Sequence, residues 1–168
     1  MLKVLVPVDG SANSLLAVRH VVNRVIGGAR LEVHLLNVRM PFSRHISYFV
    51  NRPMRESYYR DMGIQALKPA GDLLNQYGIP HILHVELGAK AETIQRLAAK
   101  LKVDEIVIGT ARKNTLTRVL EDSVTSRVLE TATVPVEVIV GADASRWERY
   151  GLPAGIGSAI AALLIAAD

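Results

Sequence analysis

The strongest constraint on the fold is the regular alternation of short apolar runs with longer segments of helical periodicity. Runs rich in valine, isoleucine and leucine span residues 2–8, 30–38, 80–87, 104–109 and 135–140, lengths that are typical of buried strands. Segments with helical spacing of apolar residues lie between them, at 15–25, 55–77, 88–101 and 123–132. Strands that alternate with crossover helices form a mainly parallel sheet covered on both faces. The pattern therefore predicts a single α/β domain.

Two segments depart from this pattern. Residues 39–53 show no clean period, and we expect a long loop there. The helical segment 55–77 contains Pro69 in its interior. Because proline lacks a backbone donor and clashes with the preceding turn, Pro69 predicts a kink or a break in that helix.

Composition narrows the functional classes. The chain of 168 residues has no cysteine, which excludes disulfides and thiolate chemistry, and its formal net charge is +4. Charged and polar residues such as Lys3 and Asp9 interrupt the start of the chain, so we expect no signal peptide and a cytoplasmic location.

Residues 39–60 mix arginines with tyrosines, as nucleic-acid-binding surfaces do. The modest net charge favours a solvated loop and a surface helix over that interpretation.

Polar groups after the strands indicate where a ligand would bind. In open α/β sheets the ligand lies beyond the carboxyl ends of the strands, where the strand order reverses. If the first strand is central, this point lies between Asp9 and the loop after Gly109. Asp9 also suits a turn, and Ser11 and Ser14 are interpreted as capping residues and not as nucleophiles.

The histidines give no sign of a metal centre or of catalysis. His81 and His84 lie three residues apart in a predicted strand and therefore point to opposite faces. None of the five histidines is spaced with carboxylates as metal ligands are, and no nucleophile-elbow motif is present. We expect no metal and no enzymatic activity.

Three separated blocks carry a family resemblance: "VLVPVDGSANSLLAV", "VDEIVIGT" and "SVTSRVLETATVPVEVIV". Together they resemble the universal stress protein family (UspA-like), in order from Met1 to about Val140. The resemblance implies an adenine-nucleotide alpha-hydrolase-like fold with a five-stranded parallel sheet of order 3-2-1-4-5. It divides the chain into a domain at 1–141 and a linker with an apolar helix at 142–168. The implied function is a non-enzymatic, homodimeric stress-response protein that acts through a protein partner of unknown identity.

A phosphate-binding loop follows the fourth strand in the ATP-binding members of this family, with the pattern Gly-x2-Gly-x9-Gly-[Ser/Thr]. The corresponding positions here are Gly109, Arg112, Asp122 and Ser123, so the two middle glycines are replaced. In those members an aspartate that matches Asp9 contacts the nucleotide, and the end of the second strand borders the adenine. The resemblance thus implies a degenerate ATP site formed by Val8, Asp9, Val38, Gly109, Thr110, Arg112, Asp122, Ser123 and Val124.

Two hypotheses follow for this altered loop. Asp122 suits the N-cap of the next helix, where its carboxylate would occupy the anion position and pair with Arg112, closing the pocket. Alternatively, Arg112, Lys113 and Arg118 would bind a phosphate through their side chains. A carboxylate at the anion position repels phosphate, which favours the closed site. We therefore expect no cofactor, with an ATP-binding and slowly hydrolysing switch as the alternative.

Two surfaces are candidates for contacts between proteins. The fifth strand, Val134 to Val140, has an edge that could pair with its twin in a homodimer, and Pro135 suits the start of such a strand. Residues 153–167 are almost wholly apolar, with helical spacing. A helix of these 15 residues spans about 22 Å. It is too short to cross a membrane, which takes roughly 20 residues. We favour packing on the domain or on a dimer mate over contact with a membrane.

Overall fold

A five-stranded parallel sheet forms the centre of the molecule. The structure, a computed structural model, describes residues 1–42, 51–112 and 124–143. The strands are β1 (Leu2–Pro7), β2 (Leu31–Arg39), β3 (His81–Leu87), β4 (Glu105–Arg112) and β5 (Val136–Asp143). Their order is β3-β2-β1-β4-β5, and each neighbouring pair is parallel. The predicted strand order 3-2-1-4-5 is confirmed, and β1 is the central strand.

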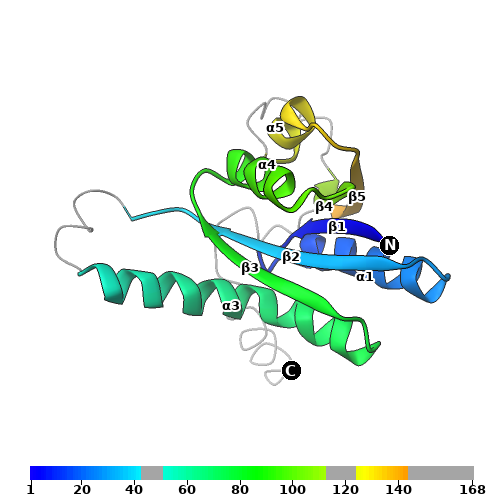
Figure 1. Ribbon diagram of the computed structural model, residues 1–168, viewed down its shortest axis with the longest axis horizontal. Helices are drawn as coiled ribbons and strands as arrows, with labels where there is room; N and C mark the ends of the chain where they lie inside the picture. The colour runs from blue at the N-terminus through cyan, green and yellow to red at the C-terminus, as the bar shows by residue number, and fades with distance from the viewer. Residues whose placement is uncertain (43–50, 113–123, 144–168) are drawn as a thin grey trace, which may run out of the picture.

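Helices cover both faces of this sheet (Figure 1). We call the face covered by α1 (Ala12–Ile26) and α3 (Arg52–Gln76) the first face, and the face covered by α4 (Lys90–Leu101) and α5 (Val124–Thr131) the second face. Alternate residues of β1 serve the two faces, because successive side chains of a strand point in opposite directions. Val4 and Val6 pack with α1 and α3, whereas Leu5 packs with α4.

The core lies in two layers, one on each side of the sheet. The layer on the first face includes Val18 of α1 and Leu67 and Leu74 of α3, all fully buried. The layer on the second face is smaller and includes Ile94 and Leu97 of α4. Both layers are apolar and continuous along the central strands, so β1, β2 and β4 are held from both sides.

The start of α3 differs from the prediction for a physical reason. The helix begins at Arg52, whereas the apolar pattern placed its start near Arg55. Asn51 caps it, because its Oδ1 accepts a hydrogen bond from the Met54 amide at 3.0 Å. Pro53 lies in the first turn, where a proline costs no hydrogen bond. Capping chemistry therefore extends the helix beyond the apolar periodicity.

The break considered at Pro69 does not occur. The helix α3 is continuous from Arg52 to Gln76 with Pro69 inside it (Figure 1). Proline removes the donor for the carbonyl four residues earlier, that of Gln65. Both Gln65 and Pro69 are exposed, so water can hydrogen-bond to this carbonyl. The buried side of the same turns, at Leu67 and Ala70, keeps the helix packed on the sheet.

A charged cluster ties the edge strand β5 to α1. Arg24 of α1 pairs with Glu105 of β4, and its Nη1 lies 3.3 Å from Oε2 of Glu137 on β5. His20 lies one turn earlier on α1, with its Nε2 2.9 Å from Oε1 of Glu137. The cluster holds the amino end of β5 against the first face.

The remaining elements agree with the predicted ones except at their ends. β4 and β5 extend further than predicted, to Arg112 and Asp143. In the described ranges, 1–42, 51–112 and 124–143, no helix is both long and apolar enough to cross a membrane. The predicted apolar helix at 153–167 lies outside the described residues.

Candidate functional site

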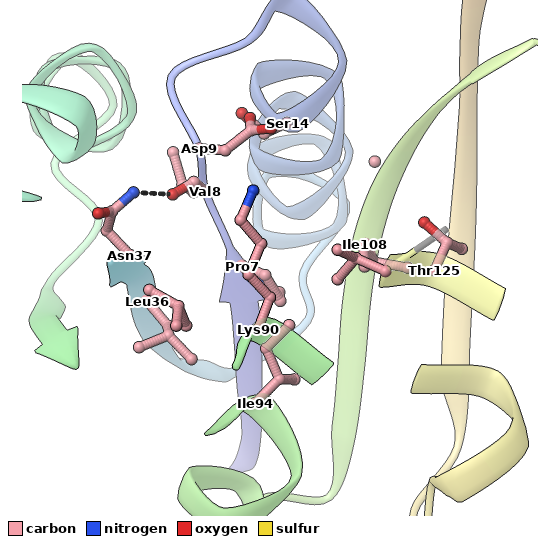
Figure 2. A pocket seen from close by; sticks show the side chains of 13 residues that line it. Pro7, Val8, Asp9, Ser14, Leu36, Asn37, Lys90, Ile94, Ile108 and Thr125 are labelled. Atoms are coloured by element: carbon pink, nitrogen blue, oxygen red, sulfur yellow. Dashed lines mark hydrogen bonds between the residues drawn. The ribbon is translucent and has the colours of Figure 1, made fainter. Parts of the chain in front are cut away.

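A cavity of about 140 Å³ opens beside the central strand, at the carboxyl ends of β1, β2 and β4. This is the point where the strand order reverses, since the chain runs from β1 to β2 on one side and to β4 on the other. Its walls are mainly apolar, and its polar side chains are few (Figure 2). The lining consists of Pro7, Val8, Asp9, Ser14, Leu36, Asn37, Val38, Lys90, Ile94, Ile108, Gly109, Val124 and Thr125.

Asp9 supplies the carboxylate of the cavity. It follows β1, and its Oδ1 accepts a hydrogen bond from the Ser11 amide at 3.0 Å, which forms the turn into α1. The Ser11 side chain in turn caps α1, accepting from the Ser14 amide at 3.2 Å. The predicted turn and capping roles of Asp9 and Ser11 are therefore confirmed.

The charge on Asp9 results from two opposing effects. Partial burial would raise the pKa of its carboxyl, because it penalises the ionised form. Hydrogen bonds from Ser11 and Ser14 and the positive charge of Lys90 outweigh burial, and the pKa of Asp9 is lowered from its usual range. The cavity therefore presents an ionised carboxylate that can accept further hydrogen bonds.

Gly109 is required by packing, independently of any ligand. A Cβ atom at this position would lie 1.9 Å from the carbonyl oxygen of Asn13 in α1. The same asparagine approaches β5, where a Cβ at Gly141 would lie 2.0 Å from its Oδ1. The first turn of α1 thus rests directly on β4 and β5. This contact explains a glycine that the family resemblance assigns to the phosphate loop.

Lys90 is a cavity residue that the sequence analysis did not identify. It is the first residue of α4, and Figure 2 shows its side chain extending along the cavity with the ammonium nitrogen toward the end where Asp9 lies. It is the only cation among the lining residues that the structure describes. The sequence could have indicated this residue by its position: Lys90 follows the third strand, and the carboxyl ends of the first and third strands lie at the same edge of a parallel sheet.

The site residues predicted from the resemblance have different outcomes in the structure. Val8, Asp9, Val38, Gly109 and Val124 line the cavity together. Thr110 follows Gly109 in β4 and is not among the lining residues. Arg112 ends β4, where its backbone pairs with that of Asp143 on β5. Asp122 and Ser123 lie outside the described residues, so the hypothesis that Asp122 closes the pocket stays a prediction.

The histidines of the sheet form a pair away from the cavity. Nδ1 of His34 on β2 lies 3.0 Å from Nε2 of His84 on β3, and Nε2 of His34 lies 3.0 Å from Oε1 of Glu32. His84 thus lies on the second face, whereas His81 faces α3 beside Gly71 on the first, as its position in the strand predicted. In the part of the chain that the structure describes, no group of three or more His, Cys, Asp or Glu side chains is arranged so that it could hold a metal ion.

The fold and the site define a class of protein: an α/β domain with a parallel sheet and a small cavity at its topological switch point. Comparison with known proteins narrows this class. Residues 1–140 match the universal stress protein family. A universal stress protein of Methanocaldococcus jannaschii (MJ0531) is 33% identical over 145 residues, covering 82% of this chain and 81% of that protein. The chain therefore belongs to the universal stress protein family.

Solved structures show the same fold at lower sequence identity. A universal stress protein from Burkholderia pseudomallei has a TM-score of 0.61 at 23% identity, covering 82% of this chain and 94% of that one. An Arabidopsis thaliana family member solved with AMP bound has a TM-score of 0.60 at 18% identity, covering 86% and 94%. A universal stress protein in complex with cAMP has a TM-score of 0.58 at 20% identity, covering 82% and 95%.

Proposed function

We propose that this protein is a non-enzymatic stress-response regulator that binds an adenosine nucleotide in the cavity and acts through protein partners as a homodimer. The observation that carries the nucleotide part is the cavity of about 140 Å³ at the switch point, with Asp9 at its mouth. The sequence analysis favoured a closed site without cofactor over a nucleotide switch. The space that the described residues leave beside β1 supports the nucleotide, and closure by Asp122 concerns residues outside the described ranges.

The chemistry of the walls suits an adenosine moiety. A cavity of about 150 Å³ accepts a ring such as benzene, so an apolar space of this size matches part of a purine. Val38 and Ile94 contribute apolar surface, and the ionised Asp9 can accept hydrogen bonds from the ribose hydroxyls. One structural relative was solved with AMP bound and another in complex with cAMP, which supports the same ligand class here.

The triphosphate of ATP is a poorer fit in this proposal. Two glycines of the family's phosphate loop are replaced by Arg112 and Asp122. Glycines allow backbone amides to approach phosphate oxygens closely, and a carboxylate among them repels the β- and γ-phosphates. The site is thus degenerate for ATP while its adenosine end is retained. Without a positioned γ-phosphate we expect no appreciable ATP hydrolysis.

The exposed edge of β5 supports the homodimer. β5 is one of the two edge strands of the sheet, and Val140 in the middle of this strand is 56% exposed. An edge strand offers unpaired backbone groups to a second copy of the chain, and valine-rich edges bury apolar surface when they pair. The surface from Val134 to Val140 is therefore the proposed dimer contact. The C-terminal segment, outside the described residues, is a second proposed contributor.

The first measurement is the nucleotide content of the purified protein, followed by calorimetric titration with AMP and with ATP. We expect AMP to bind with the higher affinity. An Asp9→Asn variant should bind AMP about 10-fold more weakly, because a neutral amide accepts weaker hydrogen bonds from a ribose. Asp72→Asn is the matched control, since Asp72 lies on the exposed side of α3 and pairs only with Lys68 among the described residues.

Two outcomes would count against the proposal. If no adenosine nucleotide binds, the site is closed, and nucleotide binding is not part of the function. Light scattering on the same sample tests the homodimer, for which we expect twice the mass of the chain. A monomeric mass at all protein concentrations would contradict the proposed homodimer.

A further inference from the structure

Lys90 contradicts the local preferences of the helix that it begins. Positions at a helix N-terminus favour acidic side chains, because the helix dipole is positive there, and a cation costs about 0.3–1 kcal/mol. Ala89, the N-cap of α4, makes no side-chain hydrogen bond that would offset this cost. A residue that breaks a local rule without a structural gain is a functional candidate.

No described neighbour accounts for the ammonium group either. Within the described ranges Lys90 makes no ion pair, in contrast to Lys68 on α3, whose Nζ lies 2.6 Å from Asp72. Its positive charge acts on Asp9, which lies toward the same end of the cavity as the ammonium nitrogen (Figure 2). The ammonium makes no hydrogen bond or ion pair with a described carboxylate, so it is available to an incoming anion.

We propose that Lys90 is the phosphate-binding residue of the cavity and that it selects a phosphorylated adenosine over adenosine itself. The inference rests on the proposed function, since it assigns a specificity determinant within the same nucleotide site. The side chain extends along the cavity between the walls formed by Leu36 and Ile108 (Figure 2). Lys90 is an exposed residue, so water partly screens its charge, and the gain on binding comes from a charge-assisted hydrogen bond between its ammonium and a phosphate oxygen.

The location of Lys90 distinguishes this contact from the phosphate loop of the family. The loop follows β4, whereas Lys90 is brought to the cavity by α4, after β3. One ammonium group can pair with one phosphate, and it does not restore the contacts that the two replaced glycines would make with the β- and γ-phosphates. The ligand class that results is an adenosine monophosphate, linear or cyclic.

The test compares AMP with adenosine in calorimetric titrations. We expect the wild-type protein to bind AMP about 10- to 100-fold more tightly than adenosine, the factor that a charge-assisted hydrogen bond provides. Lys90→Gln should remove this advantage of AMP over adenosine, and Lys90→Arg should retain most of it. Lys100→Gln is the matched control: it removes the same charge from an exposed position on the same helix.

The outcomes separate this inference from the proposed function. If the wild type binds neither compound, both fail. If AMP binds and Lys90→Gln keeps the preference over adenosine, only the role of Lys90 fails. Tighter AMP binding by Lys90→Gln would also overturn it, because the lysine would then fill the cavity as an internal partner of Asp9. Titrations with cAMP on the same variants show whether the linear or the cyclic phosphate is preferred.

Discussion

The two faces of the sheet differ in how closely their helices approach the strands. On the first face, the backbone of α1 meets β4 at Gly109 and its Asn13 side chain meets β5 at Gly141, positions where a Cβ atom has no room. On the second face, α4 lies beside a cavity of about 140 Å³. The sheet is therefore built on one side for close packing and on the other for access.

This difference separates the residues that hold the fold from those available for binding. On the first face, Arg24 pairs with Glu105 and Glu137. On the second face Lys90 has no ion pair among the described residues, and Ile82 at the edge of β3 is 47% exposed. We infer that substitutions on the first face mainly change stability, whereas those on the second face mainly change binding and pH response.

The largest expected effect is a loss of stability when a core leucine is shortened, and one such substitution on each face compares their packing. Leu67→Ala in α3 and Leu97→Ala in α4 remove the same atoms from positions that are 0% and 3% exposed. We expect a loss of about 4 kcal/mol for Leu67→Ala and about 3 kcal/mol for Leu97→Ala, since the neighbours of α4 can relax toward the cavity. Urea denaturation measures both. A larger loss for Leu97→Ala would contradict the comparison.

An intermediate effect tests the close approach of α1. Gly109→Ala places a methyl group against the backbone carbonyl of Asn13, which cannot rotate away. We expect a loss of about 2–3 kcal/mol in the free energy of unfolding, as for other overpacked sites. Gly71→Ala in α3 is the control: its Cβ would lie 3.2 Å from Nε2 of His81, the movable end of a side chain. This variant should stay within about 1 kcal/mol of the wild type, helped by the helix propensity of alanine.

If Gly109→Ala proved neutral, packing would not explain this glycine. The family's phosphate-loop role would then be the remaining explanation. Nucleotide titration of the same variant keeps the two roles apart, because a packing defect lowers stability whether or not the cavity is occupied.

Sequence patterns predicted the fold well because it depends on apolar periodicity and strand length. The runs at residues 2–8 and 30–38 correspond closely to β1 and β2, since a buried parallel strand has to be apolar throughout. The predicted start of α3 near Arg55 was wrong because capping by Asn51, and not the apolar periodicity, determines where this helix begins. Of the two outcomes predicted at Pro69, a kink or a break, the break does not occur, because the exposed carbonyl of Gln65 can be solvated.

The site was predictable only where a motif or a strand end marked it. Asp9 and Gly109 follow from the ends of β1 and β4, and both line the cavity. Lys90 has no motif, and only the path of α4 brings it to the same cavity. The pair of His34 and His84 depends on the register between β2 and β3, which composition and spacing do not determine.

The smallest expected effect is a pH dependence on the second face, at His84. Burial lowers the pKa of His84 below 6.5, the positive charges of His34 and Lys100 lower it further, and Glu86 opposes them. Above about pH 7.5 His84 is neutral in both the folded and the unfolded chain, so it adds no pH dependence there. As the pH falls below about 6.5, the unfolded chain takes up the proton first, and the folded state loses stability relative to it.

Replacing this histidine should therefore flatten the stability profile in acid. His84→Gln cannot take up the proton, so its free energy of unfolding should decline less than that of the wild type between about pH 6.5 and 5. The measurement is urea denaturation at intervals across this range. His81→Gln is the control, because it removes a histidine from the same strand but from the first face, beside Gly71. Parallel profiles for the wild type and His84→Gln would contradict the prediction, because they would mean that His84 has the same pKa in the folded and the unfolded chain.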